Sequence, residues 1–219
     1  AAIEGALEAG ATEVVVCDAH ANMQNLKPEL LHRSARLVRG AIRESLQMEG
    51  IDKTFSGVFV TGAHAAAGTE KAVLDHTWVS RSVLNIRVDG VTLNEACLND
   101  LVAGHNGVPT VLVTGDQATI DQTREVLPHI EGAVVKESYS RYCANSVHPE
   151  VARDIIREHA YKAVQRIPEV KPTVVPDVLT MEIDFYRTDM ADAAALVPGV
   201  ERVNARTIRT QFDPATTFR

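Results

Sequence analysis

The chain has 219 residues, of which 45% are apolar, 23% charged and 5% aromatic, and its formal net charge is −7. This composition is typical of a globular protein with one large domain or two small ones. The acidic balance, with no block rich in Lys and Arg, argues against a nucleic-acid-binding protein, which needs a basic surface to replace phosphate counterions.

The first elements expected along the chain are a helix end and three short strands. Residues 1–10 have the pattern of the last turns of a helix followed by a glycine stop. Short runs rich in apolar and β-branched residues then predict extended segments, at 13–17, 35–39 and 55–61. This start looks cut, so we expect a strand to precede it in a longer chain.

The middle of the chain alternates between strands and helices. The dipeptide Asp89-Gly90, between extended segments at 82–88 and 91–93, is a strong hairpin signal. Further strands are expected at 109–114 and 133–136, and helices at 93–103, 117–127 and 149–165. This alternation predicts an α/β fold with a mainly parallel sheet and flanking helices.

From residue 171 onward the pattern changes, with prolines separating strand-rich pieces. We expect strands at 177–185, 200–204 and 207–212. The chain is therefore expected to divide into an α/β domain over 1–170 and a smaller α+β C-terminal lobe over 171–219. Asp213-Pro214 has the pattern of an N-cap and first position of one more helix, so this end also looks cut.

Membrane and secreted classes find no support in the sequence. No stretch approaches the roughly 20 consecutive apolar residues that span a bilayer, and no basic leader precedes an apolar run. The three cysteines, Cys17, Cys97 and Cys143, are too few for a disulfide framework. We therefore expect a cytoplasmic protein.

Candidate functional residues follow the predicted strands, because ligands of open parallel sheets bind beyond the carboxyl ends of strands. Three of the eight histidines, His20, His64 and His76, lie in loops after or near strands. Neutral imidazole is the commonest metal ligand, and a hydrolytic site pairs it with carboxylates such as Glu95. Composition and spacing alone therefore indicate a metallohydrolase and nothing more specific.

Plainer interpretations stand beside this one. A loop histidine is more often solvated or a cap than a ligand, Asp18 fits an Asx turn, and Glu95 fits a first-turn carboxylate. Asp116 fits an N-cap, which is the interpretation we favour. A solvated loop is likewise favoured for 135–141, although its Lys and Arg could bind a carboxylate or line an oligomer contact. No spacing matches a compact metal motif such as His-Glu-x-x-His.

Several motifs nevertheless recur in an order that is specific as a set. They are Val-Cys-Asp-Ala-His-Ala-Asn-Met at 16–23, Phe-Ser-Gly-Val-Phe-Val-Thr-Gly-Ala-His-Ala at 55–65, Asp-His-Thr-Trp at 75–78, Asn-Glu-Ala-Cys-Leu-Asn at 94–99 and Val-Lys-Glu-Ser-Tyr-Ser-Arg at 135–141. With these motifs the chain resembles, from end to end, the D-aminopeptidase DppA family, the M55 zinc metallopeptidases.

The resemblance implies a two-zinc site in an α/β domain with a smaller second lobe. Carried over residue by residue, His20 matches the histidine on one zinc, and His64 and Glu95 match the ligands on the other. His76 matches a non-ligand histidine that acts in catalysis. The family's remaining ligands lie in an Asp-x-Glu-Gly motif on its first strand, which this sequence does not contain, so the zinc ligand set within the chain is incomplete.

The expected function is therefore that of a di-zinc aminopeptidase, which hydrolyses N-terminal, D-configured amino acids from short peptides by means of a metal-bound water. The expected partners are short peptide substrates and further copies of the chain in a ring-like homo-oligomer, a decamer being one such ring. No nucleic acid and no membrane are expected as partners. Two alternatives stay open: a non-catalytic, oligomeric small-molecule-binding paralogue, and a di-metal amidohydrolase of other specificity.

Overall fold

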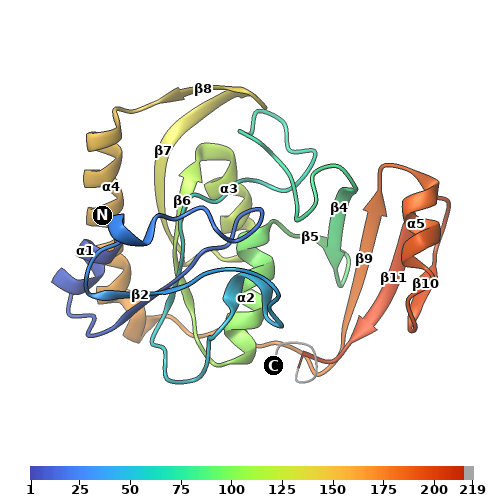
Figure 1. The fold of residues 1–219 in the computed structure, drawn as a ribbon, viewed down its shortest axis with the longest axis horizontal. Helices are drawn as coiled ribbons and strands as arrows, with labels where there is room; N and C mark the ends of the chain where they lie inside the picture. Colours follow the sequence, from blue (N-terminus) through green and yellow to red (C-terminus); the bar gives the residue numbers. More distant parts are fainter. Residues whose placement is uncertain (215–219) are drawn as a thin grey trace.

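The computed structural model describes residues 1–214 (Figure 1). Its helices are α1 (Ala2–Glu8), α2 (Glu95–His105), α3 (Gln117–Val126), α4 (Pro149–Arg166) and α5 (Thr188–Ala194). Its strands are β1 (Val14–Cys17), β2 (Ala35–Val38), β3 (Val58–Val60), β4 (Val83–Val88), β5 (Val91–Thr92), β6 (Thr110–Asp116), β7 (Glu131–Ser140), β8 (Cys143–Ser146), β9 (Leu179–Phe185), β10 (Val200–Arg202) and β11 (Thr207–Phe212). The residues after Pro214, onto which the helix expected from Asp213-Pro214 would extend, lie outside this part.

The central sheet has the strand order β3-β6-β7-β8, and its first three strands are parallel. Every residue of β6 is buried, as expected for a strand that is covered on both faces. Helices α1 and α4 lie on one side of this sheet, and α2 and α3 lie on the other (Figure 1). The predicted α/β fold with parallel strands and flanking helices is confirmed.

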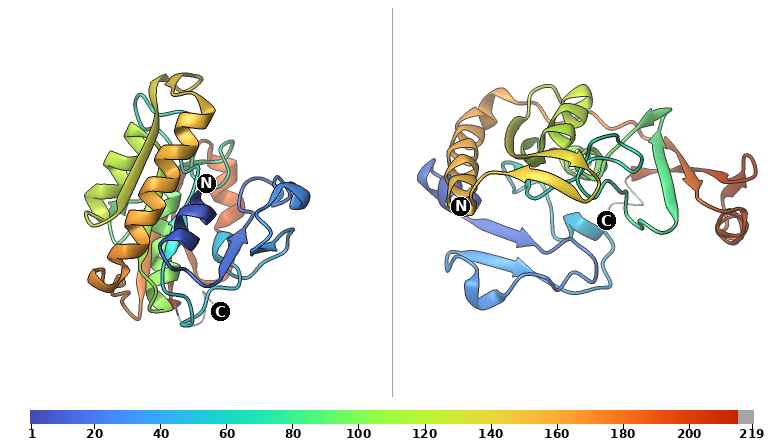
Figure 2. Two further views of the ribbon diagram at one scale, coloured as in Figure 1. Left: turned by 90° about the vertical axis from the view of Figure 1, so that its left-hand side faces the viewer. Right: turned by 90° about the horizontal axis from the view of Figure 1, so that it is seen from above.

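Two further sheets flank this centre. Strands β1 and β2 form a parallel pair of their own, which lies beside the central layers (Figure 2). The other sheet is antiparallel, with the order β10-β11-β9-β4-β5. Asp89 and Gly90, between β4 and β5, have φ values of 48° and 83°, the positive pair that a tight two-residue hairpin turn requires.

Because β4 pairs with β9, the antiparallel sheet takes strands from both sides of residue 171. The hairpin of β4 and β5 precedes the long α/β segment in the chain but joins the strands that follow it. The division into 1–170 and 171–219 stays a prediction, and this sheet shows that the two parts share main-chain hydrogen bonds.

The clearest departure from the predicted elements concerns β7 and β8. The expected strand at 133–136 is the middle of a ten-residue strand, and the segment 135–141, favoured as a loop, is largely its second half. That half pairs antiparallel with β8, which was not predicted. Both pieces are polar and partly exposed, so they lack the apolar run by which a strand is recognised.

Helix α5 was also not predicted as an element. It is a short helix of seven residues that packs near β9 and β11 in the C-terminal part. Within residues 1–214, no helix combines the length and the apolar character needed to cross a membrane.

Candidate metal centre

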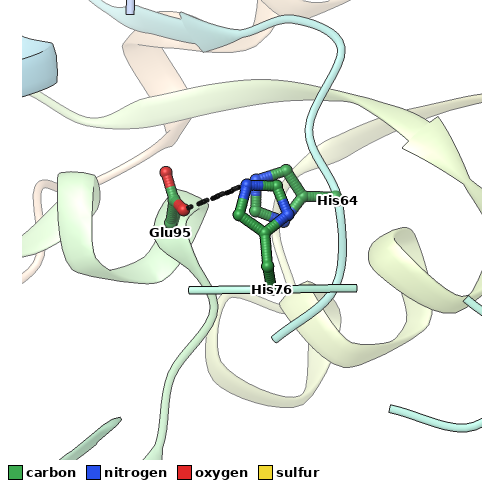
Figure 3. A group of neighbouring side chains, drawn as sticks. All are labelled: His64, His76 and Glu95. Carbon is green, nitrogen blue, oxygen red and sulfur yellow. Dashed lines mark ion pairs between the residues drawn. The ribbon is translucent and has the colours of Figure 1, made fainter. Parts of the chain in front are cut away.

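Three side chains, two from the long loop between β3 and β4 and one from the start of α2, meet at one point beyond the end of β3. His64 follows β3, His76 lies in the loop between β3 and β4, and Glu95 is the first residue of α2 (Figure 3). The Nε2 atom of His64 is 3.5 Å from Glu95 Oε1, and the Nε2 atom of His76 is 4.0 Å from the same oxygen. One ligand atom from each residue lies within 4.8 Å of the others.

The fourth residue carried over from the family, His20, lies against the edge of this group. Its ring meets the ring of His76 edge to face, with centroids 5.8 Å apart, while the rings of His64 and His76 stack at 3.6 Å. The structure thus brings together His20, His64, His76 and Glu95. His76 lies inside the three-residue group, and His20 lies beside it.

Both imidazoles of the group are oriented by a backbone carbonyl. The Nδ1 atom of His64 is 3.1 Å from Ala65 O, and that of His76 is 2.5 Å from Leu74 O. A carbonyl oxygen only accepts hydrogen bonds, so each Nδ1 carries the ring hydrogen. In the neutral imidazole, Nε2 then keeps its lone pair and faces Glu95. This is the arrangement of a metal-binding histidine, whose other ring nitrogen donates to a backbone carbonyl.

The group is well shielded from solvent. The side chains of His64, His76 and Glu95 are 15%, 13% and 11% exposed. Burial lowers the pKa of His64 below its ordinary value of 6.5, and the neighbouring His76 lowers it further, while the Glu95 carboxylate opposes this shift. The neutral imidazole is thereby favoured, and this is the form that binds a metal ion.

Helix α2 fixes the place of Glu95 through its N-cap. The buried Asn94 accepts a hydrogen bond from the Cys97 amide at 3.0 Å and donates one to Thr123 Oγ1 at 2.9 Å. The first bond satisfies an amide at the start of the helix, and the second ties that start to α3. Glu95 is thus at a first-turn position and also points into the site.

The two oxygens of the Glu95 carboxylate have different partners. Oε1, which faces the histidines, accepts a hydrogen bond from the Trp78 amide at 2.7 Å. Oε2 accepts one from the side-chain amide of Gln47, whose own oxygen accepts a bond from Asn99 at 2.6 Å. These contacts hold the plane of the carboxylate before any metal ion binds.

Asp18 and Asp116, the other candidate carboxylates, lie outside the group and brace loops. Asp116 is the N-cap of α3, as expected, with Thr119 as its helix partner, and its second oxygen accepts a bond from the Val73 amide at 2.7 Å. Asp18 accepts bonds from the side chain of Asn25 and the amide of Leu26.

The contacts of Asp18 shape the loop that carries His20. Burial of Asp18 opposes ionisation, but the hydrogen bonds from Asn25 and Leu26 outweigh it and lower the pKa of this carboxyl. The side-chain amide of Asn25 also donates to His20 O at 2.5 Å. Asp18 therefore stabilises the loop through residues seven and eight positions away, which is farther than the Asx turn expected for it.

Two supporting side chains, Arg43 and Gln47, carry no signal in the sequence. The buried guanidinium of Arg43 donates to Asp18 O at 2.9 Å and to Val38 O at 3.2 Å, which joins the ends of β1 and β2. Gln47 reaches Glu95 from 48 positions away in the chain. No local pattern links residues that far apart, so only the fold reveals these contacts.

Comparisons with known proteins place these findings in context. The family model Peptidase_M55, described as D-aminopeptidase, matches residues 1–218. The D-aminopeptidase of Bacillus subtilis strain 168 is 34% identical over 210 residues, which cover 96% of this chain and 76% of that protein. The solved structure of the Zn-dependent D-aminopeptidase DppA from Bacillus subtilis, a self-compartmentalizing protease, matches with a TM-score of 0.95 at 32% identity, covering 99% of this chain and 79% of the other.

Proposed function

Because the chain belongs to the M55 family of D-aminopeptidases, we propose that it removes N-terminal D-amino acids from short peptides at a two-zinc site. Family membership itself makes the chain a zinc-dependent metallo-aminopeptidase. The number of metal ions, the configuration of the substrate and the role of each residue are the parts that we propose. The observation that carries them is the meeting of His64, His76 and Glu95 in one shielded group.

The types of donor atom in this group suit zinc, although their number within the chain is below a full ligand set. Zinc in proteins takes imidazole nitrogens and carboxylate oxygens, usually three or four in all. His64 and Glu95 would hold one ion, and His20 would contribute to the other. The Nδ1 atom of His64, bound to Ala65 O, supplies the outer contact that orients a ligating ring.

His76 is the residue that we assign to proton transfer. Zinc, when bound, supplies Lewis acidity that polarises the scissile carbonyl and lowers the pKa of water from about 15.7 toward 7. His76 keeps its Nδ1–H on Leu74 O, so its Nε2 is free to accept a proton from the attacking water and to pass it to the leaving amine. Glu95, 4.0 Å away, stabilises the positive charge on His76 between these two transfers.

Assembly and location are part of the same proposal. The description of the Bacillus subtilis structure as a self-compartmentalizing protease supports a homo-oligomer, and we propose a ring of ten copies that encloses the sites. The cytoplasm is proposed as its location because the cysteines Cys17, Cys97 and Cys143 are all free.

A direct assay tests the proposed reaction. The zinc-loaded protein should release the N-terminal residue from D-Ala-D-Ala and leave L-Ala-L-Ala and a phosphate diester intact. Removal of zinc with a chelator should abolish this hydrolysis, and added zinc should restore it. Equal cleavage of the L-dipeptide, or hydrolysis of the phosphodiester alone, would contradict the proposed substrate class, and no hydrolysis at all would contradict the assigned activity.

A further inference from the structure

The segment that carries His76 is held to the rest of the molecule residue by residue. The amide of Val73 donates to Asp116 Oδ2 at 2.7 Å, and the amide of Leu74 donates to Arg141 O at 2.9 Å. The amide of His76 itself donates to Ala65 O at 3.2 Å. A loop without regular secondary structure is thereby fixed through three of the four amides of residues 73–76.

The backbone on both sides of His76 is in a conformation that needs such support. Leu74 and Trp78 have φ values of 51° and 53°, in the left-handed region that residues other than glycine seldom adopt. Such residues persist where surrounding contacts determine the conformation, and they cluster at functional sites. The amides of both residues are bound, that of Leu74 to Arg141 and that of Trp78 to Glu95.

Arg141 contacts this segment with both its backbone and its side chain. It lies in the turn between β7 and β8, within the segment 135–141 for which the proposed reaction has no other use. Its Nη1 atom donates to Asp75 Oδ1 at 2.5 Å and also to the carbonyl oxygen of Asp75. The second carboxylate oxygen of Asp75 accepts a bond from the Gly68 amide at 2.7 Å.

We propose that Arg141 is a positioning residue for His76, an inference that rests on the catalytic role given to His76 above. The Leu74–Asp75 peptide unit lies between two contacts of Arg141, one on the Leu74 amide and one on the Asp75 carbonyl. The carbonyl of that peptide unit is Leu74 O, the acceptor that fixes His76 Nδ1. The first contact is made by the backbone carbonyl of Arg141 and the second by its guanidinium. Loss of the guanidinium therefore frees the Asp75 side of the unit, which lets Leu74 O shift and loosens the orientation of the imidazole toward the site.

Kinetics of the zinc-loaded enzyme test this assignment. Arg141→Ala should lower kcat for the D-dipeptide by about 10- to 100-fold, the effect of a misplaced catalytic group, with KM and zinc content unchanged. Arg141→Lys should recover part of the lost kcat, because a single nitrogen makes both contacts with Asp75. The matched control is Arg187→Ala, which breaks an exposed pair with Asp189 in the C-terminal part and should keep the wild-type kcat.

A second measurement needs no metal and no activity. In zinc-free protein, hydrogen–deuterium exchange over residues 72–78 should be at least severalfold faster in Arg141→Ala than in wild type and unchanged in Arg187→Ala. Asp75→Asn, which keeps an oxygen for Arg141 but loses the charge, should change exchange and kcat in the same direction. This variant decides the question if Arg141→Ala does not fold.

Wild-type exchange rates and kcat in both Arg141→Ala and Asp75→Asn would overturn the assignment, as would a loss of zinc that accounts for the whole fall in kcat. If the wild-type enzyme cleaves no D-dipeptide, the proposed function fails, and the exchange rates of the zinc-free protein still decide whether Arg141 holds the His76 segment.

Discussion

At the scale of single residues, the site is organised by the hydrogen bonds that its side chains make with the surrounding structure. His64 and His76 each place Nδ1 on a backbone carbonyl, and Glu95 is held through both carboxylate oxygens. Preorganised ligands lose little conformational freedom when a metal ion or a substrate binds. The residues that provide these outer contacts should therefore affect the site almost as strongly as the residues that line it.

The variant Asn94→Ala tests whether an outer contact affects the site. The change removes the N-cap of α2 and leaves the buried Thr123 hydroxyl without its donor, so we expect a loss of about 1–3 kcal/mol in the free energy of unfolding. Zinc affinity should fall as well, because Glu95 is the next residue. Denaturant unfolding and zinc titration measure the two effects.

The matched control for this prediction is His148→Ala, since His148 caps α4 through its exposed side chain, far along the chain from the site. That variant should bind zinc as the wild type does. Wild-type zinc affinity in Asn94→Ala would contradict the role given to the cap.

At the scale of elements, the antiparallel sheet is joined by ion pairs across its strands. Arg87 on β4 makes two bonds to Asp184 on β9, at 2.5 and 3.1 Å, and also contacts Glu182. Arg209 on β11 binds Glu182 from the other side at 2.7 Å. The hairpin of β4 and β5 is thus tied by charge to β9, through residues that lie 95 and 97 positions later in the chain.

The contribution of these ion pairs to stability should appear in the pH dependence of the Asp184→Asn variant. The hydrogen bonds from Arg87 lower the pKa of Asp184 from its ordinary value of 3.8, against the opposing effect of burial. Its contribution is therefore complete above the unfolded pKa and is lost as pH falls through the lower folded pKa. The difference in Tm between wild type and variant should be constant above about pH 5 and should shrink below about pH 4.

We expect this difference to correspond to about 1–2 kcal/mol near neutral pH, and thermal unfolding across pH 2–7 measures it. Asp189→Asn serves as the control, because the side chains of its pair with Arg187 are 65% and 66% exposed, so the change should alter Tm little at any pH. A Tm difference that grows toward low pH would contradict the assigned direction of the shift.

The elements also show where sequence patterns stop being informative. Short runs rich in apolar and β-branched residues predicted β1, β3 and β6, and the Asp-Gly turn predicted the hairpin of β4 and β5, because these signals are local. The polar second half of β7 and all of β8 lack an apolar pattern and are strands by virtue of pairing with each other. Which strands share a sheet depends on contacts between distant segments, which no local pattern encodes.

The same limit applies to the site. Strand ends pointed to His20 and His64, while the roles of Glu95 and His76 came from the resemblance to a family. Membership of that family is confirmed over residues 1–218. The supporting contacts of Gln47 with Glu95 and of Arg141 with Asp75 join residues 48 and 66 positions apart, so they became visible only in the folded structure.

At the scale of the whole molecule, three separate segments must fold together to bring His20 beside the candidate metal-binding group of His64, His76 and Glu95. The loop after β3, the start of α2 and the loop after β1 each bring one or two of these residues, and β7 with β8 holds the segment of His76 from outside. We propose that the enzyme separates metal binding by His20, His64 and Glu95 from proton transfer by His76.

The most direct test measures zinc content and D-dipeptide hydrolysis together in wild type, His76→Ala and Glu95→Gln. His76→Ala should keep the zinc content of the wild type and lose at least about 100-fold in kcat, the usual contribution of a general acid–base group. Glu95→Gln should lose zinc and activity together. A His76→Ala protein that hydrolyses the dipeptide at the wild-type rate, or that loses zinc as Glu95→Gln does, would contradict this division of roles.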